Sequence, residues 1–174
     1  MQSLALSLRQ YLELEKIGLG AFAPLTGFMD EGQFHSVVDT MHLPDNNPFP
    51  LPVVLDLDSD SAKTLPRDAP VTLSYNGEEV GQIAVGSVYS CDKEAAAEKV
   101  FGTGDRRHPG VDHFYRMGDY FVGGEVLEFL PLLPIRVIVS QSRYYPKSFA
   151  ISNHVYHEVQ QLTMLRPTVL PRPS

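Results

Sequence analysis

The sequence predicts a small α+β domain built on a mostly antiparallel, curled sheet with short helices, followed by a C-terminal helical extension. Three observations lead to this fold class. Short β-prone runs are separated by turn residues, and the 174 residues include 13 glycines and 14 prolines. Two of these runs are joined by Asn76-Gly77, the usual signal of a type I′ hairpin. Strands and helices do not alternate regularly, which argues against a doubly wound nucleotide-binding domain.

The first expected helix covers residues 3–17, because its apolar side chains recur mostly at helical spacing and Gly18 and Gly20 follow it. Residues 20–29 then form a loop that is too apolar to face water, so we expect it to pack against the domain. A second helix begins at Asp30, which makes a capping-box-like pair with Gln33. Its apolar stripe is Phe34, Val37, Val38 and Met41, and the prolines between residues 44 and 52 end it.

Three expected strands follow, at residues 51–58, 71–75 and 80–88, and the last two form the hairpin. Side chains of these strands and of the apolar loop should make the core. We expect burial of Phe22, Leu25, Phe28, Val54, Leu55, Val71, Leu73, Ile83, Val85 and Val88.

Asp92 is the expected N-cap of a short helix that stops at Gly102. A loop over residues 104–110 and a helical turn over 111–117 come next. Two short strands, at 120–122 and 125–130, complete the domain.

We place the domain at residues 1–135 and the extension at residues 136–174. Residues 135–139 could add one strand, and residues 153–165 predict a helix with a proline-rich, frayed end after it. We expect this helix either to fold back over the domain or to cross to a second copy and make a homodimer. Its apolar stripe is Val155, Val159, Leu162 and Leu165.

Composition limits the partners, the cellular location and the cofactors that we expect. The net charge is −7, with 14 Lys and Arg against 21 Asp and Glu, so nucleic acid is a disfavoured partner. No apolar run is long enough to cross a membrane, and the start of the chain lacks the pattern of a secretory signal. The single cysteine, Cys91, excludes an internal disulfide and a thiolate zinc site. We therefore expect a cytoplasmic protein with no metal and no cofactor.

Three sequence patterns resemble binding sites for a dinucleotide, calcium or phosphate, but each fits a simpler interpretation better. Residues 18–23 match G-x-G-x-x-A, but they follow a helix and run into a proline, which favours a helix end over a dinucleotide site. Residues 56–60 resemble the start of a calcium loop, yet the required Gly and Glu are missing, which favours a solvated strand end. His154-x-x-His157 resembles the phosphate-binding pair of nucleotidyltransferases, but too few residues follow it to build a nucleotide-binding sheet.

Three ordered motifs are more specific. Residues 20–29, Gly-Ala-Phe-Ala-Pro-Leu-Thr-Gly-Phe-Met, resemble the G-x-F-x-P-L-x-G-F-M signature of the ATP sulfurylase (sulfate adenylyltransferase) family. The second motif is Phe-Gly-Thr followed by His-Pro-Gly-Val, within residues 101–111, and the third is Tyr-Phe-Val-Gly-Gly at residues 120–124. The resemblance covers residues 3–130 and implies the N-terminal domain of that family, which is a PUA-like β-barrel.

The resemblance also implies that the catalytic motifs of the family belong to a different domain. In the family, ATP and sulfate bind to the following domain through a Q-x-R-N-P-x-H-R-A-H motif and a later Gly-Arg-Asp motif, and neither occurs in this sequence. Residues 152–158 echo part of the first motif without its Arg and Pro. We therefore assign no catalytic residue.

The motif residues have expected structural roles as turn formers and packing groups. These are Gly20, Phe22, Pro24, Leu25, Gly27, Phe28, Gly102, Pro109 and Gly110. The candidates for binding an anion such as sulfate or phosphate are Arg106, Arg107 and His108, which lie on a glycine-bounded loop. The alternative for these three residues is a solvated loop tip.

Two functions remain open. The first is a free-standing, non-catalytic binding or assembly module linked to sulfate activation, inactive as an enzyme alone. The second is a fragment or subunit of a sulfate adenylyltransferase whose partner is a separate catalytic chain. RNA binding rests only on analogy with PUA folds and conflicts with the negative charge.

Overall fold

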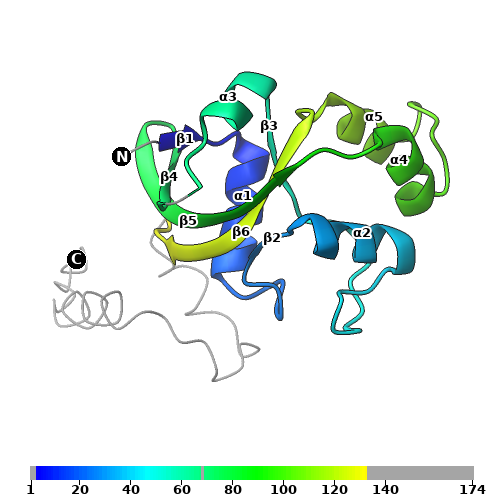
Figure 1. Cartoon of the computed structure of the whole chain (residues 1–174), viewed down its shortest axis with the longest axis horizontal. Coiled ribbons are helices and arrows are strands. Elements are labelled where there is room, and N and C mark those ends of the chain that lie inside the picture. Colours follow the sequence, from blue (N-terminus) through cyan, green and yellow to red (C-terminus); the bar gives the residue numbers. More distant parts are fainter. Residues whose placement is uncertain (1–2, 68, 133–174) are drawn as a thin grey trace, which may run out of the picture. The chain divides into compact units, whose positions relative to one another are not determined.

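The computed structural model describes residues 3–67 and 69–132, which form one mixed sheet with helices around it (Figure 1). The expected strand at 135–139, the helix at 153–165 and the pair His154 and His157 lie outside the described residues. The division into a domain at 1–135 and an extension at 136–174 therefore stays a prediction.

The described elements alternate without a regular pattern. The strands are β1 (Ser3–Ala5), β2 (Gly27–Phe28), β3 (Leu55–Leu57), β4 (Val71–Tyr75), β5 (Glu78–Tyr89) and β6 (Tyr120–Phe129). The helices are α1 (Leu8–Gly18), α2 (Glu31–Thr40), α3 (Ser59–Thr64), α4 (Lys93–Phe101) and α5 (Pro109–Arg116). This content confirms the α+β class.

The sheet has the strand order β1-β4-β5-β6-β2, with β3 also pairing with β6. Only β1 and β4 pair in parallel, and the other four pairings are antiparallel. The strands of the described residues form an open path with β1 and β2 as its outer members, so the predicted closed barrel is not confirmed. The physical reason is that β2 has only two residues and pairs on one side with β6 alone.

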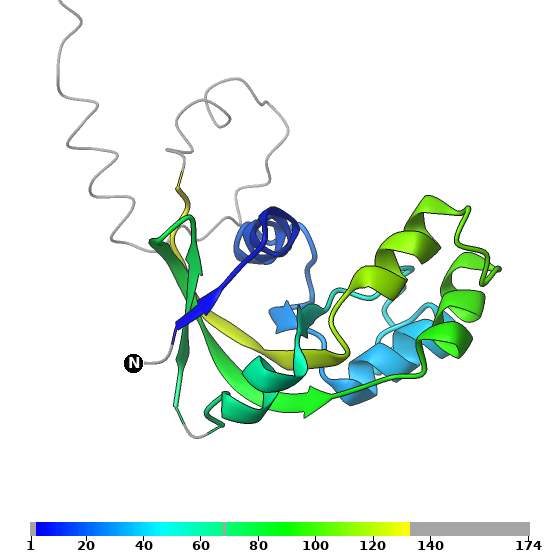
Figure 2. The ribbon, with the colours of Figure 1, turned by 90° about the horizontal axis from the view of Figure 1, so that it is seen from above.

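Turning the molecule shows α1 lying across the sheet (Figure 2). The helices α2, α4 and α5 gather beside the C-terminal end of β5 and the N-terminal end of β6. The aromatic side chains of Phe34, Tyr89, Phe114 and Phe121 pack together in this region, with ring centroids 5.6–6.2 Å apart. The Tyr89 hydroxyl donates a hydrogen bond to the backbone oxygen of Met29 at 2.8 Å. Burial of the ring raises the pKa of this phenol well above its ordinary value.

The capping signals of α2 and α4 were interpreted correctly. Asp30 accepts from the backbone N–H of Gln33, and the Gln33 side chain in turn accepts from the backbone N–H of Asp30. Asp92 caps α4, and Gly102 ends it with a positive φ of 70°. The hairpin is confirmed as well, because Asn76 and Gly77 both have positive φ values, as a type I′ turn requires.

Four expected elements differ from the structure. Residues 3–5 are a strand rather than helix, because Ser7 caps α1 through a capping box with Gln10. The strand expected at 51–58 is limited to β3, and α3 follows it. The helical turn expected at 111–117 is α5, which begins earlier, at Pro109. The two short strands expected at 120–122 and 125–130 are the single strand β6, which keeps pairing with β5 through two register shifts.

Eight of the ten residues expected in the core are buried, among them Phe28 with 2% exposure. The exceptions are Phe22 and Val88, which are partly buried and pack against the core from its edge. Of the α2 stripe, Met41 is 55% exposed, because it takes a left-handed conformation as the helix ends.

Candidate functional site

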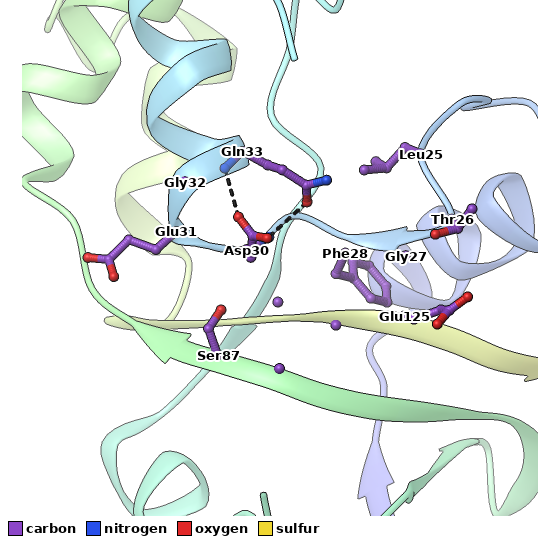
Figure 3. A pocket seen from close by; sticks show the side chains of 13 residues that line it. Leu25, Thr26, Gly27, Phe28, Asp30, Glu31, Gly32, Gln33, Ser87 and Glu125 are labelled. Carbon is purple, nitrogen blue, oxygen red and sulfur yellow. Dashed lines mark hydrogen bonds between the residues drawn. The ribbon is translucent and has the colours of Figure 1, made fainter. Parts of the chain in front are cut away.

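A groove of about 560 Å³ lies where three parts of the chain meet (Figure 3). One side is the segment from Leu25 through β2 to the first turn of α2. The floor is formed by residues 86–87, near the end of β5, and residues 123–125 of β6. Two of the three family-like motifs, residues 20–29 and 120–124, contribute to this groove, and its lining is Leu25, Thr26, Gly27, Phe28, Asp30, Glu31, Gly32, Gln33, Gly86, Ser87, Gly123, Gly124 and Glu125.

The glycines of this groove allow backbones to approach each other closely. A Cβ atom on Gly27 would overlap the carbonyl oxygen of Gly124, and one on Gly124 would overlap the carbonyl oxygen of Ala84. A Cβ atom on Gly123 would collide with the backbone of Met29 and Asp30. The groove therefore has a floor of main chain, with few side chains standing on it.

Charge in the groove has one sign. Its ionisable side chains are Asp30, Glu31 and Glu125, and no basic side chain lines it. Asp30 is occupied in capping α2, whereas Glu31 and Glu125 have no ion pair within the described residues. The hydroxyl oxygen of Ser87 is buried and has no hydrogen-bond partner in the described chain. This arrangement suits a partner surface that carries basic and hydrogen-bonding groups.

The anion-binding candidates Arg106, Arg107 and His108 are all exposed, and each lies beside another side chain: Tyr115, Asp105 and Phe101, respectively. The Arg107 guanidinium is paired with the Asp105 carboxylate, and this pairing lowers the pKa of Asp105. The Arg106 guanidinium lies over the ring of Tyr115, 5.0 Å from its centroid. His108 is the N-cap residue of α5 and makes no side-chain capping bond.

The remaining family-like residues lie at turns, at the start of α5 and at the edge of the core. Gly20 has a positive φ of 71°, and a Cβ atom on Gly110 would come within 2.7 Å of the Phe101 ring. Pro109 is the first residue of α5, where its missing N–H leaves no bond unmade. Leu25 is buried, while Pro24 stays on the surface. The exposed position of Pro24 does not match the packing role expected of it, and the structural roles of the other motif residues stay a prediction.

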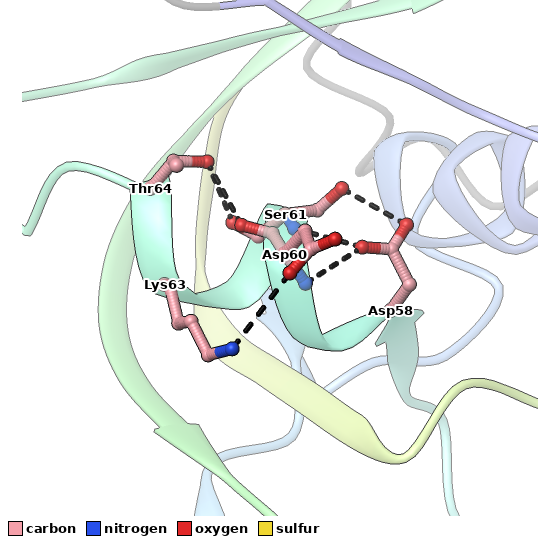
Figure 4. A network of polar contacts seen from close by, with 5 residues as sticks. All are labelled: Asp58, Asp60, Ser61, Lys63 and Thr64. Atoms are coloured by element: carbon pink, nitrogen blue, oxygen red, sulfur yellow. Dashed lines mark hydrogen bonds and ion pairs between the residues drawn. The ribbon is translucent and has the colours of Figure 1, made fainter.

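The calcium-like run at residues 56–60 includes the end of β3, as expected, and continues into the start of α3 (Figure 4). Asp58 accepts hydrogen bonds from the backbone N–H groups of Asp60 and Ser61, so it is the N-cap of α3, and these bonds lower its pKa. Asp60 pairs with Lys63 at 3.7 Å. Among the residues described, no group of three His, Cys, Asp or Glu side chains is arranged to hold a metal ion.

The structure also locates the G-x-G-x-x-A pattern and the single cysteine. The G-x-G-x-x-A pattern at residues 18–23 begins at the last residue of α1 and continues into turns, so it does not connect a strand to a helix. Burial raises the pKa of the Cys91 thiol to about 11, which keeps it protonated at neutral pH. No helix in the described ranges is long and apolar enough to cross a membrane.

A second, smaller pocket of about 110 Å³ was missed by sequence reasoning. It lies between α1, β3 and α5, and Arg9, Asp56 and His113 are among its lining residues. Asp56 follows Arg9 by 47 positions and His113 follows Asp56 by 57, so no local sequence pattern connects them. The one available signal was the spacing of His113 and Arg116 on one helix face.

Comparison with known proteins identifies the domain. A family model for the PUA-like domain matches residues 1–129. A sulfate adenylyltransferase of Thermococcus onnurineus is 39% identical over 115 residues, which are 66% of this chain and 30% of that protein. One from Schizosaccharomyces pombe is 37% identical over 136 residues, 76% of this chain and 28% of that protein.

A solved structure titled as the hexameric APS kinase from Thiobacillus denitrificans has the same fold over 80% of this chain and 23% of its own, with a TM-score of 0.56 and 24% identity. This chain thus spans about 30% of the length of the curated relatives given above. The family match and the sulfate adenylyltransferase relatives agree with the resemblance carried by the three motifs. The chain belongs to the PUA-like domain family and is similar to one part of the sulfate adenylyltransferases.

Proposed function

We propose that this chain is a non-catalytic binding or assembly module linked to sulfate activation. The observation that carries the proposal is the extent of the match: relatives named sulfate adenylyltransferase correspond to it over only about 30% of their length. The sequence also lacks the R-N-P-x-H and Gly-Arg-Asp motifs expected to hold ATP and sulfate. On this proposal, the role is to contact a catalytic adenylyltransferase region, and the setting is the cytoplasm.

The groove between β2, α2 and β6 is the proposed contact surface. Gly86 exposes main chain in this groove, so a partner segment can approach the sheet there, whereas the chain's own backbone already packs against Gly123 and Gly124. The carboxylates of Glu31 and Glu125 lack ion pairs in the described chain, and basic partner groups would supply them. Such charge complementarity mainly sets partner choice and association rate.

A direct assay tests the non-catalytic role. The purified full chain is expected to form no ATP from adenylyl sulfate and pyrophosphate, whereas the Thermococcus onnurineus relative, assayed in parallel, should do so. Robust turnover by the chain alone would overturn the proposal.

A chimera tests the contact surface. Residues 3–130 would replace the matching region of the Thermococcus onnurineus protein, and the product should keep adenylyltransferase activity. Glu31→Gln with Glu125→Gln should weaken that activity, while the matched control Glu78→Gln with Glu98→Gln, on exposed carboxylates outside the groove, should leave it unchanged. Equal activity of both double variants would show that the groove is not the contact.

The second candidate function is a subunit or fragment of a sulfate adenylyltransferase. A neighbouring coding region that encodes the missing R-N-P-x-H-x-x-H domain would favour it over a free-standing module. A homodimer is the alternative partner, and the structural neighbour is itself titled hexameric. Light scattering on the purified full chain separates a monomer from these assemblies.

We also propose that Arg106, Arg107 and His108 hold an anion at the start of α5. The exposed guanidiniums and the helix N-terminus favour negative charge, although Asp105 already neutralises Arg107. Arg106→Gln should therefore weaken binding of inorganic sulfate more than Arg107→Gln does, as measured by chemical-shift titration of the full chain. If sulfate shifts the signals of both variants as much as those of the unmodified protein, neither arginine binds it. These three residues would then be a solvated loop tip.

A further inference from the structure

His113 on α5 has one ring nitrogen that the protein encloses and leaves without a partner. Its Nε2 atom is buried, and no described group donates a hydrogen bond to it or accepts one from it. The rest of the side chain is partly exposed and lines the small pocket between α1, β3 and α5. Buried polar atoms almost always have a hydrogen-bond partner, so this atom is an exception in the fold.

The lack of a partner penalises the charged form of the His113 ring. A neutral imidazole carries an N–H group on one nitrogen, whereas an imidazolium carries one on both. Protonation therefore places a charged N–H donor at the buried Nε2 atom, whichever tautomer the neutral ring adopts. Water does not reach this atom, so that part of the charge is neither hydrated nor bonded.

The charged groups around the ring are of both signs. They are Arg9 and Glu13 on α1, Asp56 on β3, and Asp112 and Arg116 on α5. Burial is the main cause that lowers the pKa of His113, and the positive charges of Arg9 and Arg116 lower it further. Asp56 and Asp112 oppose this shift but do not reverse it. The imidazole is therefore predominantly uncharged at neutral pH.

Asp56 connects the three elements beside His113. One of its carboxylate oxygens accepts from the Gln10 amide of α1 at 2.8 Å. The other accepts from the backbone N–H of Gly118, directly after α5, at 2.7 Å. Both oxygens are thus occupied by neutral donors. A charged His113 can gain an acceptor or water at Nε2 only if the ring or the Asp56 carboxylate moves.

We propose that the junction of α1, β3 and α5 is an acid-sensitive contact, closed when His113 is neutral and loosened when His113 is protonated. Either the ring moves into water together with the last turn of α5, or it draws Asp56 away from Gly118. Both movements weaken the bond that fixes the end of α5. This device depends neither on the proposed assembly role nor on the acidic groove.

The direction of the pH dependence follows from the lowered pKa of His113. In the loosened state the ring is free and has the ordinary histidine pKa of about 6.5. The loosened state therefore binds the proton more tightly than the closed state does. The contact is fully stable above about pH 6.5 and loses stability as the pH falls below that value, until the pKa of the closed state is passed.

Amide hydrogen exchange of the full-length protein, followed by NMR from about pH 5 to about pH 7.5, tests the proposal. After correction for the intrinsic pH dependence of exchange, the opening equilibrium at the Gly118 amide should increase below pH 6.5. The increase should be at most about tenfold per pH unit, because a single proton is taken up. The carboxyl groups whose pKa is lowered, those of Asp39, Asp58 and Asp105, titrate below this range.

Variants assign the effect to one side chain. His113→Gln keeps a polar side chain that does not titrate, so opening at Gly118 should become independent of pH in this range. The matched control is His35→Gln, at an exposed histidine of α2, which should retain the pH dependence. An equal rise of opening in His113→Gln would overturn the proposal, because another group would then cause it.

A titration of the unmodified protein decides the outcome even if His113→Gln does not fold. The NMR signal of the His113 ring should titrate with a midpoint below about 6.5. A midpoint at or above that value would overturn the proposal. Equal opening of the Gly118 amide at both ends of the pH range would overturn it as well.

Discussion

Phe28→Ala is expected to lower the free energy of unfolding by about 3–5 kcal/mol, the usual range for removal of a buried phenylalanine ring. Phe28 is only 2% exposed and lies on β2, where its backbone pairs with Gly124 of β6. Removing the ring leaves a cavity under a strand of two residues, which has little other pairing to hold it in place. Urea unfolding followed by circular dichroism measures the change.

Phe22→Ala is the matched control for this prediction. It removes the same ring from the same motif, but Phe22 is only partly buried at the edge of the core. It makes an edge contact with Phe49, with ring centroids 6.0 Å apart. A loss for Phe22→Ala as large as that for Phe28→Ala would contradict the core position assigned to Phe28.

Gly27→Ala is expected to destabilise the protein by about 3 kcal/mol or more, at or above the upper end of the usual range for overpacking. The new methyl group would overlap the carbonyl oxygen of Gly124 and lie 2.8 Å from the Cα atom of Glu125. Both are backbone atoms, so no side-chain rotation can relieve the contact, and β2 would have to separate from β6. Thermal melting and amide hydrogen exchange of Glu125 and Val126 report this separation.

Gly86→Ala provides the comparison, because Gly86 lines the same groove from β5. Its new Cβ atom would lie 3.6 Å from the carbonyl oxygen of Gly123, an ordinary contact distance. We expect a change within about 0.5 kcal/mol, as for most surface substitutions. Equal destabilisation by Gly86→Ala and Gly27→Ala would show that loss of glycine itself, and not the close backbone approach, causes the effect.

The local signals of the sequence predicted local structure well. Asp30 with Gln33, Asp92 with Gly102, and Asn76-Gly77 each act through bonds or φ values within four residues or within one short helix. Such signals depend little on the rest of the fold. The prediction at residues 3–5 was wrong for the opposite reason, since β1 exists through its pairing with β4, about 70 residues away.

The strand at residues 120–129 likewise depends on distant parts of the chain, which local sequence patterns do not reveal. Gly123 and Gly124 interrupt the apolar pattern and suggested two strands, yet β6 runs through them unbroken. There, glycine is required because β5 and the segment 27–30 cross β6 closely on either side. A glycine that serves a close approach and one that serves a turn look alike in the sequence.

By itself, the sequence determined the α+β class, most of the caps and turns, eight of ten core positions, and the family through three ordered motifs. Tertiary structure alone decided that the described sheet is open, that the residue 20–29 and 120–124 motifs meet in one acidic groove, and that Arg9 and His113 face one pocket. The physical reason is the separation along the chain over which each kind of interaction acts. Caps, turns and hydrophobic periodicity act between neighbours in the chain, whereas a groove or pocket depends on side chains that only the packing of distant elements brings together.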